Sequence, residues 1–308
     1  MSLFSIQLSK RFISITGPDS SKFLQGQTSC DINELSTANF SYSTINTPKG
    51  RMYCLFKVLK TEHGFLLSMD ESLLESTLQK LSKYAVFFKC ELEEDSSLTA
   101  FGITASHEND YKDFVNSVQL NKKVFSVSNQ EDLTFALNIS PQNMLTEVWL
   151  KKDADQPQYL DQCKAMTTEN WFALETKAGI PELYSSSQEE FILQSLNLHH
   201  LGAVSFKKGC YTGQEIIARM KFLGKQKKQA YLIHSEQECI EPPLAPVYNQ
   251  EGAKCGTIIR SHWSEQTGSI ALCILPIEKA LDYENVFLSK TLNIPFSVSE
   301  INYSEFNF

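Results

Sequence analysis

The apolar segments of this chain come as pairs of short strands joined by turns, with single helices between the pairs. Residues 51–60 and 64–70 flank the turn-forming segment TEHG, as the two strands of a hairpin do. The next segment, 74–85, has the apolar spacing of a helix. Because hairpins and not a regular strand–helix–strand repeat organise the apolar residues, the sequence predicts a mixed α+β fold.

The length of 308 residues is too great for one compact core of ordinary size, so we expect two or three domains that share interfaces. From residue 229 onward, short strand-like segments alternate with turn residues, which is typical of a small all-β domain. The sequence shows no internal repeat and no low-complexity linker between these parts.

The composition excludes two classes of protein. A formal net charge of -8 argues against a surface built to coat nucleic acid, so any polyanion site must be local. No run of about 18 apolar residues occurs, which removes a helical membrane span. Residues 1–17 lack the basic start of a secretory signal. We therefore expect a cytoplasmic protein.

The eight cysteines are scattered, with no CxxC pair and no histidine partner at zinc-ligand spacing. We therefore expect no tightly bound metal. Scattered cysteines in a chain of this length are most often reduced core residues. Cys210 is the exception, because of the residues on either side of it.

Cys210 lies in the run KKGCYTGQEIIARMKF, residues 207–222, between two lysines and a predicted helix. The apolar spacing of this run predicts that the helix begins near Thr212, so Cys210 comes just before a helix N-terminus. The free N–H groups there, together with Lys207 and Lys208, favour a thiolate and would make Cys210 reactive. A partly buried structural thiol is the alternative interpretation.

Residues 207–228 hold seven basic residues against one acidic residue, Glu215. Glu215 comes four residues before Arg219, a spacing that supports a side-chain pair on a helix. A local surplus of six positive charges indicates a place for an anionic ligand or partner, or equally a solvated basic face. The turn TPKGRM presents the same choice, since Lys49 and Arg51 either face an anion or form a plain basic turn.

The run LGAVSFKKGCYTGQEIIARMKFLGKQKKQAYL, residues 201–232, resembles the signature of the YgfZ family of folate-binding proteins, which are relatives of the glycine-cleavage T-protein. Segments from ITGPDSSKFLQGQTSCDI to WFALETKAGIP resemble further parts of that family, so the resemblance covers most of residues 10–235. It implies a three-domain ring with two ferredoxin-like α+β domains and a C-terminal β-barrel. We expect a discontinuous first domain with the KGCYTGQE motif, then a second domain and the barrel: residues 1–45 with 145–228, 46–144 and 229–308.

The resemblance implies that the chain binds tetrahydrofolate or a derivative and is an accessory protein, not a classical enzyme. Its partners would be iron–sulfur enzymes such as tRNA methylthiotransferases, whose clusters it helps to assemble or repair, and through them it would support tRNA modification. We further expect a monomer with weak or no direct affinity for tRNA. The resemblance implies catalytic roles for Lys208 and Cys210. It implies folate contacts from nine residues: Gly209, Tyr211, Gly213, Gln214, Glu215, Arg219, Trp171, Lys49 and Arg51.

Two other functions stay open as alternatives. The first is tetrahydrofolate-dependent aminomethyl transfer or demethylation. T-protein aminomethyltransferases have an aspartate in the strand that here reads KGRMYCLF, another aspartate where Cys210 stands, and a glutamate where Lys177 stands. Loss of acid or base groups at three positions makes this chemistry disfavoured. The second alternative is a tRNA-binding protein, which predicts tight, salt-dependent tRNA affinity through residues 207–228.

Overall fold

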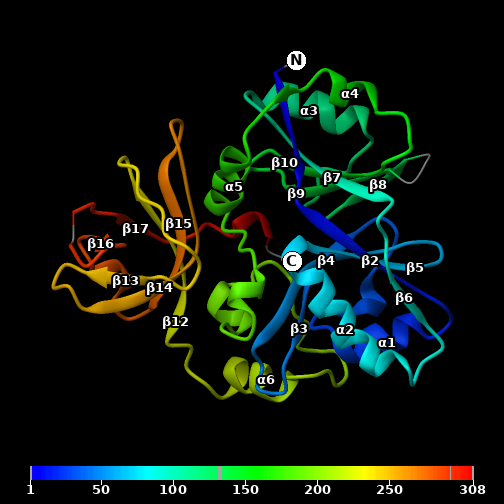
Figure 1. The fold of residues 1–308 in the computed structure, drawn as a ribbon, viewed down its shortest axis with the longest axis horizontal. Helices are drawn as coiled ribbons and strands as arrows, with labels where there is room; N and C mark the ends of the chain where they lie inside the picture. The colour runs from blue at the N-terminus through cyan, green and yellow to red at the C-terminus, as the bar shows by residue number, and fades with distance from the viewer. Residues whose placement is uncertain (1, 131–133, 292, 307–308) are drawn as a thin grey trace.

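The computed structural model describes residues 2–130, 134–291 and 293–306, which form three β-sheets and six α-helices. Figure 1 shows the C-terminal sheet on one side of the molecule and the other two sheets one above the other. The predicted α+β class is therefore confirmed. None of the helices among these residues has the length and apolarity needed to cross a membrane.

The first sheet has six strands in the order β11–β1–β7–β10–β9–β8, antiparallel except for the pair β1–β11. Its strands are β1 (Leu3–Leu8), β7 (Leu98–Ala105), β8 (Val127–Gln130), β9 (Thr134–Ser140), β10 (Leu145–Lys151) and β11 (Lys164–Ala165). Helices α3 (Glu108–Ser117) and α4 (Gln158–Asp161) cover its outer face (Figure 1). Helix α3 forms there because its apolar residues share one face, which buries Phe114 against the strands.

The second sheet has five strands in the order β3–β4–β5–β2–β6, all antiparallel. Its strands are β2 (Lys10–Thr16), β3 (Phe40–Asn46), β4 (Met52–Lys60), β5 (Gly64–Asp70) and β6 (Glu91–Glu94). The outer face carries α1 (Ser20–Gln27) and α2 (Leu74–Ala85), as Figure 1 shows. The hairpin predicted for residues 51–70 is β4–β5, and the predicted helix after it is α2, so both predictions are confirmed.

The C-terminal sheet has six strands in the order β16–β13–β14–β15–β12–β17. Its strands are β12 (Lys228–Ser235), β13 (Pro246–Asn249), β14 (Lys254–Ser264), β15 (Gly268–Pro276), β16 (Val286–Phe287) and β17 (Ser297–Ser299). A bridge between Val286 and Phe296 brings the two edges of this curved sheet together. The register between β14 and β15 shifts between Ile258 and Arg260, which marks a β-bulge.

The segment between the first two sheets and the C-terminal sheet is helical and irregular. It contains α5 (Thr168–Lys177), which packs on β14 and β15, and α6 (Gln214–Phe222).

Across the described residues, short 3-10 turns occur at Ile32–Glu34, Glu71–Leu73, Ser185–Ser187, Leu193–Leu196, Ala280–Asp282 and Ser304–Phe306. The largest apolar core includes residues of all three sheets, such as Phe12, Trp149 and Ile259. Phe12 and Trp149 join the second sheet to the first, with ring centroids 5.1 Å apart.

The strands group differently from the predicted domain boundaries. The boundary between residues 45 and 46 falls inside β3, which pairs with β4 along its whole length. The second sheet takes its strands from residues 10–94, and the first sheet takes β1 together with strands from residues 98–165. The reason is that the chain crosses between the two sheets at Ser9, immediately after its first strand.

Candidate functional site

The glycines of the KGCYTGQE motif allow two loops to meet. Gly213 precedes α6 with a φ of +86°, a left-handed conformation that favours glycine. A Cβ at this position would lie 2.6 Å from the backbone oxygen of Thr47. A Cβ at Gly50 would lie 3.0 Å from Cβ of Ile216. The turn that carries Lys49 therefore packs against the start of α6, which begins at Gln214, close to the predicted start near Thr212.

Lys208 points into the protein. Its Nζ donates hydrogen bonds to the backbone oxygens of Thr28 at 2.8 Å and Cys30 at 2.7 Å. Nζ also lies 5.0 Å from the ring centre of Tyr211, which is itself buried. Burial lowers the pKa of Lys208 to about 8. In this arrangement the lysine fastens the motif to the segment that follows α1, and its predicted catalytic role stays a prediction.

Cys210 lies on the surface, in the loop between Lys208 and α6. Of the eight cysteines, all of them within the described residues, it alone is exposed. Gly209 before it is also exposed, and a Cβ there would have open space around it. The thiol is therefore accessible to a reagent or a partner, as the predicted reactivity requires. Within the described part of the chain, no group of three or more His, Cys, Asp and Glu side chains is arranged to hold a metal ion.

The other motif residues lie around this loop. Gln214 donates a hydrogen bond from Nε2 to the backbone oxygen of Lys208 at 3.4 Å. Glu215 and Arg219 are both exposed, and within the described residues they form no ion pair, so the predicted pair is wrong. A side-chain pair on a solvated helix is weak enough to give way to hydration.

The remaining predicted contacts are spread over the molecule. Lys49 is exposed on its turn. Arg51 donates from Nη1 to the backbone oxygens of Glu189 and Glu190, so its charge already has partners. Trp171 is fully buried in α5 against Gly102 of β7, and α5 lies well apart from α6 in Figure 1. The motif and the turn are thus brought together, whereas Trp171 is not part of the same cluster.

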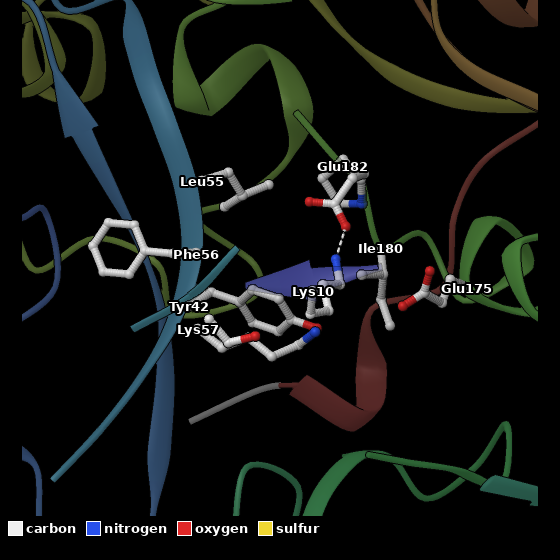
Figure 2. Close-up of a pocket in the computed structure, with 10 residues that line it drawn as sticks. Lys10, Tyr42, Leu55, Phe56, Lys57, Glu175, Ile180 and Glu182 are labelled. Atoms are coloured by element: carbon white, nitrogen blue, oxygen red, sulfur yellow. Dashed lines mark hydrogen bonds and ion pairs between the residues drawn. The ribbon is translucent and has the colours of Figure 1, made fainter. Parts of the chain in front are cut away.

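A cluster of buried charges occupies the junction of the three sheets. Its three ion pairs are Lys10–Glu182, Lys57–Glu147 and Arg260–Glu175. Figure 2 shows four of these side chains and Tyr42 around a cavity of about 10 Å³, enough for one water molecule. The hydroxyl of Tyr42 at this cavity is buried and has no hydrogen-bond partner. Three positive and three negative groups make the cluster neutral, which is how buried charges are tolerated.

The pKa shifts of Lys57 and Glu182 favour their ionised forms. Burial alone would raise the pKa of Glu182, but Lys10 and Lys57 hold it below its ordinary value. Burial alone would lower the pKa of Lys57, but Glu147 holds it above its ordinary value. With each carboxylate paired to a cation, none of them is free to act as a general base.

A groove of about 630 Å³ opens beside the charge cluster. The end of the second sheet, the linker after α5 and the C-terminal sheet line it: Asp70, Glu71, Ser72, Tyr184, Ser185, Ser186, Ile240, Glu241, Pro242, Pro243, Arg260, Ser261 and His262. The β14 bulge places Arg260 where it belongs both to the groove and to the charge cluster.

Arg260 uses most of its donors inside the protein. Nη1 donates to Glu175 at 3.2 Å and to the backbone oxygen of Ile180 at 3.4 Å, and Nε donates to Nε2 of His262 at 3.0 Å. Burial and the charge of Arg260 lower the pKa of His262 to about 3, so the imidazole is neutral and can accept this bond. Nη2 is buried and has no hydrogen-bond partner. The guanidinium therefore has one donor without a partner, in a residue that lines the groove.

Sequence reasoning missed the charge cluster and Arg260. A signal was present in the apolar run RMYCLFKVLK, where Lys57 interrupts a strand, and in CGTIIRSHW, where Arg260 follows two isoleucines. A charge inside an otherwise apolar strand indicates a buried partner.

One comparison with known proteins shows the fold. No family model matches the chain. Among solved structures, the chain is similar to the glycine cleavage system aminomethyltransferase T from Bartonella henselae, with a TM-score of 0.77 and 14% sequence identity. The alignment covers 100% of this chain and 88% of that chain. The similarity shows a fold of the glycine-cleavage T-protein type, as predicted, and the narrower resemblance to the YgfZ family stays a prediction.

Proposed function

We propose that this protein binds a reduced folate in the groove beside Arg260 and serves as an accessory protein for iron–sulfur enzymes, with Cys210 as its reactive group. The observation that carries the folate site is Arg260, a residue of the groove whose buried Nη2 has no hydrogen-bond partner. A buried donor without an acceptor is unfavourable, and a ligand oxygen would relieve it.

The groove suits a ligand of this class in size and chemistry. Small-molecule sites usually have volumes of roughly 300–1,000 Å³, and about 630 Å³ lies within that range. Folates combine a flat ring system with carboxylates on a glutamate tail. Tyr184 and Ile240 offer surface for the ring, and a carboxylate at Arg260 would form a charge-assisted hydrogen bond. The T-protein fold and the resemblance of residues 201–232 to folate-binding YgfZ proteins support folate as the ligand, whereas none of the nine folate contacts implied by the resemblance lines this groove.

An accessory role fits the residues better than aminomethyl transfer. The strand that should supply an aspartate carries the buried thiol of Cys54, and Lys177 is exposed in place of a glutamate. The buried carboxylates of the charge cluster are held in ion pairs. Cys210 does not line the folate groove, so we propose that it acts on the partner enzyme and not on the folate.

The folate site is tested by thermal unfolding with tetrahydrofolate and with its formyl derivative. Ligand at a hundredfold excess over Kd should stabilise the native protein by about 2.7 kcal/mol. Ile240→Ser should weaken this effect, whereas Leu281→Ser should not, because both side chains are 56% exposed but only Ile240 lines the groove. The proposal fails if neither folate raises the melting temperature at millimolar concentration.

The accessory role is tested separately through Cys210. The variant Cys210→Ala removes an exposed side chain, so it should fold and bind folate as the parent does. In cells that lack the parent gene, it should fail to restore the activity of iron–sulfur enzymes such as tRNA methylthiotransferases. Full restoration by this variant would show that Cys210 is not needed for the accessory role, and it would not contradict the proposed folate site.

A further inference from the structure

The end of α6 exposes two large apolar side chains next to each other. Phe222 is 66% exposed and Leu223 is 85% exposed. The ring of Phe222 packs edge-on against Phe206, with centroids 5.9 Å apart, and Nζ of Lys221 lies 5.5 Å from the ring centre of Phe206. Leu223 follows Phe222 directly in the chain, and we name these four residues the α6 patch. Single exposed apolar residues are ordinary, but contiguous ones mark interaction sites.

Positive charge surrounds the α6 patch. Lys207 follows Phe206 directly, and Arg219 and Lys227 are exposed nearby along the chain. Lys225 pairs with Glu278 at 2.8 Å, but both side chains are largely exposed, and such pairs separate readily when a partner approaches. Residues 207–228 carry seven basic residues against one acidic residue in a chain of net charge -8, and all of the seven except the buried Lys208 are exposed. An apolar centre with a charged rim is the usual anatomy of a protein–protein interface.

We infer that the α6 patch docks a partner protein whose own surface has an apolar side chain surrounded by carboxylates. Charge complementarity selects the acidic partner, and Phe222 with Leu223 supplies the apolar contact. A nucleic acid fits less well, because Leu223 gains nothing from phosphates and the acidic remainder of the chain repels a long polyanion. None of the patch residues lines the groove at Arg260, so the inference does not rest on folate binding.

The protein carries a second exposed apolar site that serves as a matched control. Val86 and Phe87, at the end of α2, are 75% and 81% exposed. Their neighbours along the chain carry charges of both signs: Lys83 and Lys89 are positive, and Glu91 and Glu93 are negative. An acidic partner should distinguish the two sites by charge, although both are apolar.

The test is selection of peptides from a random library displayed on phage, with the whole protein as bait. Selected peptides should combine acidic residues with aliphatic or aromatic ones. Their Kd, measured by fluorescence anisotropy, should rise by roughly tenfold or more for Phe222→Ser/Leu223→Ser, as expected for loss of an interface centre. Lys221→Glu should also weaken binding, and added salt should reduce the difference. Val86→Ser/Phe87→Ser should bind like the parent.

Each other outcome overturns the inference. A selection that yields no binders, or binders without acidic residues, would contradict the inference that the partner is acidic. If the selected peptides bind the variant Phe222→Ser/Leu223→Ser as tightly as they bind the parent, the α6 patch is not the binding site. A tRNA transcript that binds the parent at physiological salt and loses affinity in the same variant would assign the patch to nucleic acid. Thermal unfolding of the variants checks that these exposed substitutions leave the fold intact.

Discussion

The pair Arg260–Glu175 is the best place to test whether the buried charges stabilise the fold as pairs. Arg260 is 1% exposed, and Nη1 lies 3.2 Å from Oε2 of Glu175. The variants are Glu175→Gln, Arg260→Met and the double variant. Each single variant leaves one buried charge without its main partner, whereas the double variant removes both charges and keeps most of the volume.

The structure sets the expected magnitudes. Breaking a buried ion pair by removing one partner costs about 3–5 kcal/mol, because the remaining charge stays out of water. We expect the lower end, about 3 kcal/mol, for Glu175→Gln, since Arg260 keeps its bonds to Ile180 and His262. Replacement of both charges by uncharged groups of similar size is often nearly neutral. The double variant should therefore lose much less than the two single losses added together.

Urea unfolding of the four proteins gives these free energies and the coupling between the two sites. The exposed pair Lys225–Glu278 provides the control, and the same cycle there should show no measurable coupling. The reasoning is refuted if the loss in the double variant equals the two single losses added together. In that case packing and not paired charge would account for the effect. Arg260→Met should also let the pKa of His262 rise toward its ordinary value, which NMR titration would show.

Three further predictions concern the motif. Gly213→Ala should lower the free energy of unfolding by about 2 kcal/mol or more, because the backbone there is left-handed and a Cβ would lie 2.6 Å from the backbone oxygen of Thr47. The control is Gly252→Ala, where φ is +75° but a Cβ has open space around it. This variant should lose only about 1 kcal/mol in the same urea unfolding assay. Burial lowers the pKa of Lys208 from 10.5 to about 8, so above pH 8 the unfolded chain binds more protons than the native chain. Between pH 8 and 10 the parent should gain about 1–2 kcal/mol relative to Lys208→Met, after allowance for solvent screening. Iodoacetamide should label Cys210 first, as mass spectrometry of the native protein would show, and well before the three buried cysteines, Cys30, Cys54 and Cys273. Equal labelling rates would contradict the exposure of Cys210, and equal losses at the two glycines would contradict the contact with Thr47.

The sequence predicts those parts of the fold that depend on nearby residues. The hairpin of β4 and β5 and the helix α2 follow from apolar spacing and turn residues within short windows. The start of α6 near Thr212 follows from the same kind of local signal. The allocation of strands to sheets does not, because β1 and β2 are separated by one residue and yet pair with strands far along the chain.

The candidate site shows the same limit. Lys57 and Glu147 are ninety positions apart, and the apolar strand around Lys57 indicates a buried partner without specifying which residue it is. Only the folded chain reveals that both are buried and paired. Lys208 shows the reverse error, since its place beside Cys210 suggested a field acting on the thiol, whereas its Nζ turns inward to two backbone oxygens. Side-chain direction depends on the packing of distant segments, which spacing does not specify.

The single residue between β1 and β2 has a consequence for how the protein is made on the ribosome. The partners of β2 have all been synthesised once Glu94 has emerged, so the second sheet can assemble early. The partners of β1 begin only at Leu98 and end at Ala165. At roughly 5–20 residues per second, Leu3 and Leu8 remain on an unpaired strand for several seconds. A chaperone that holds this nascent strand would delay the first sheet while the second sheet forms beside it.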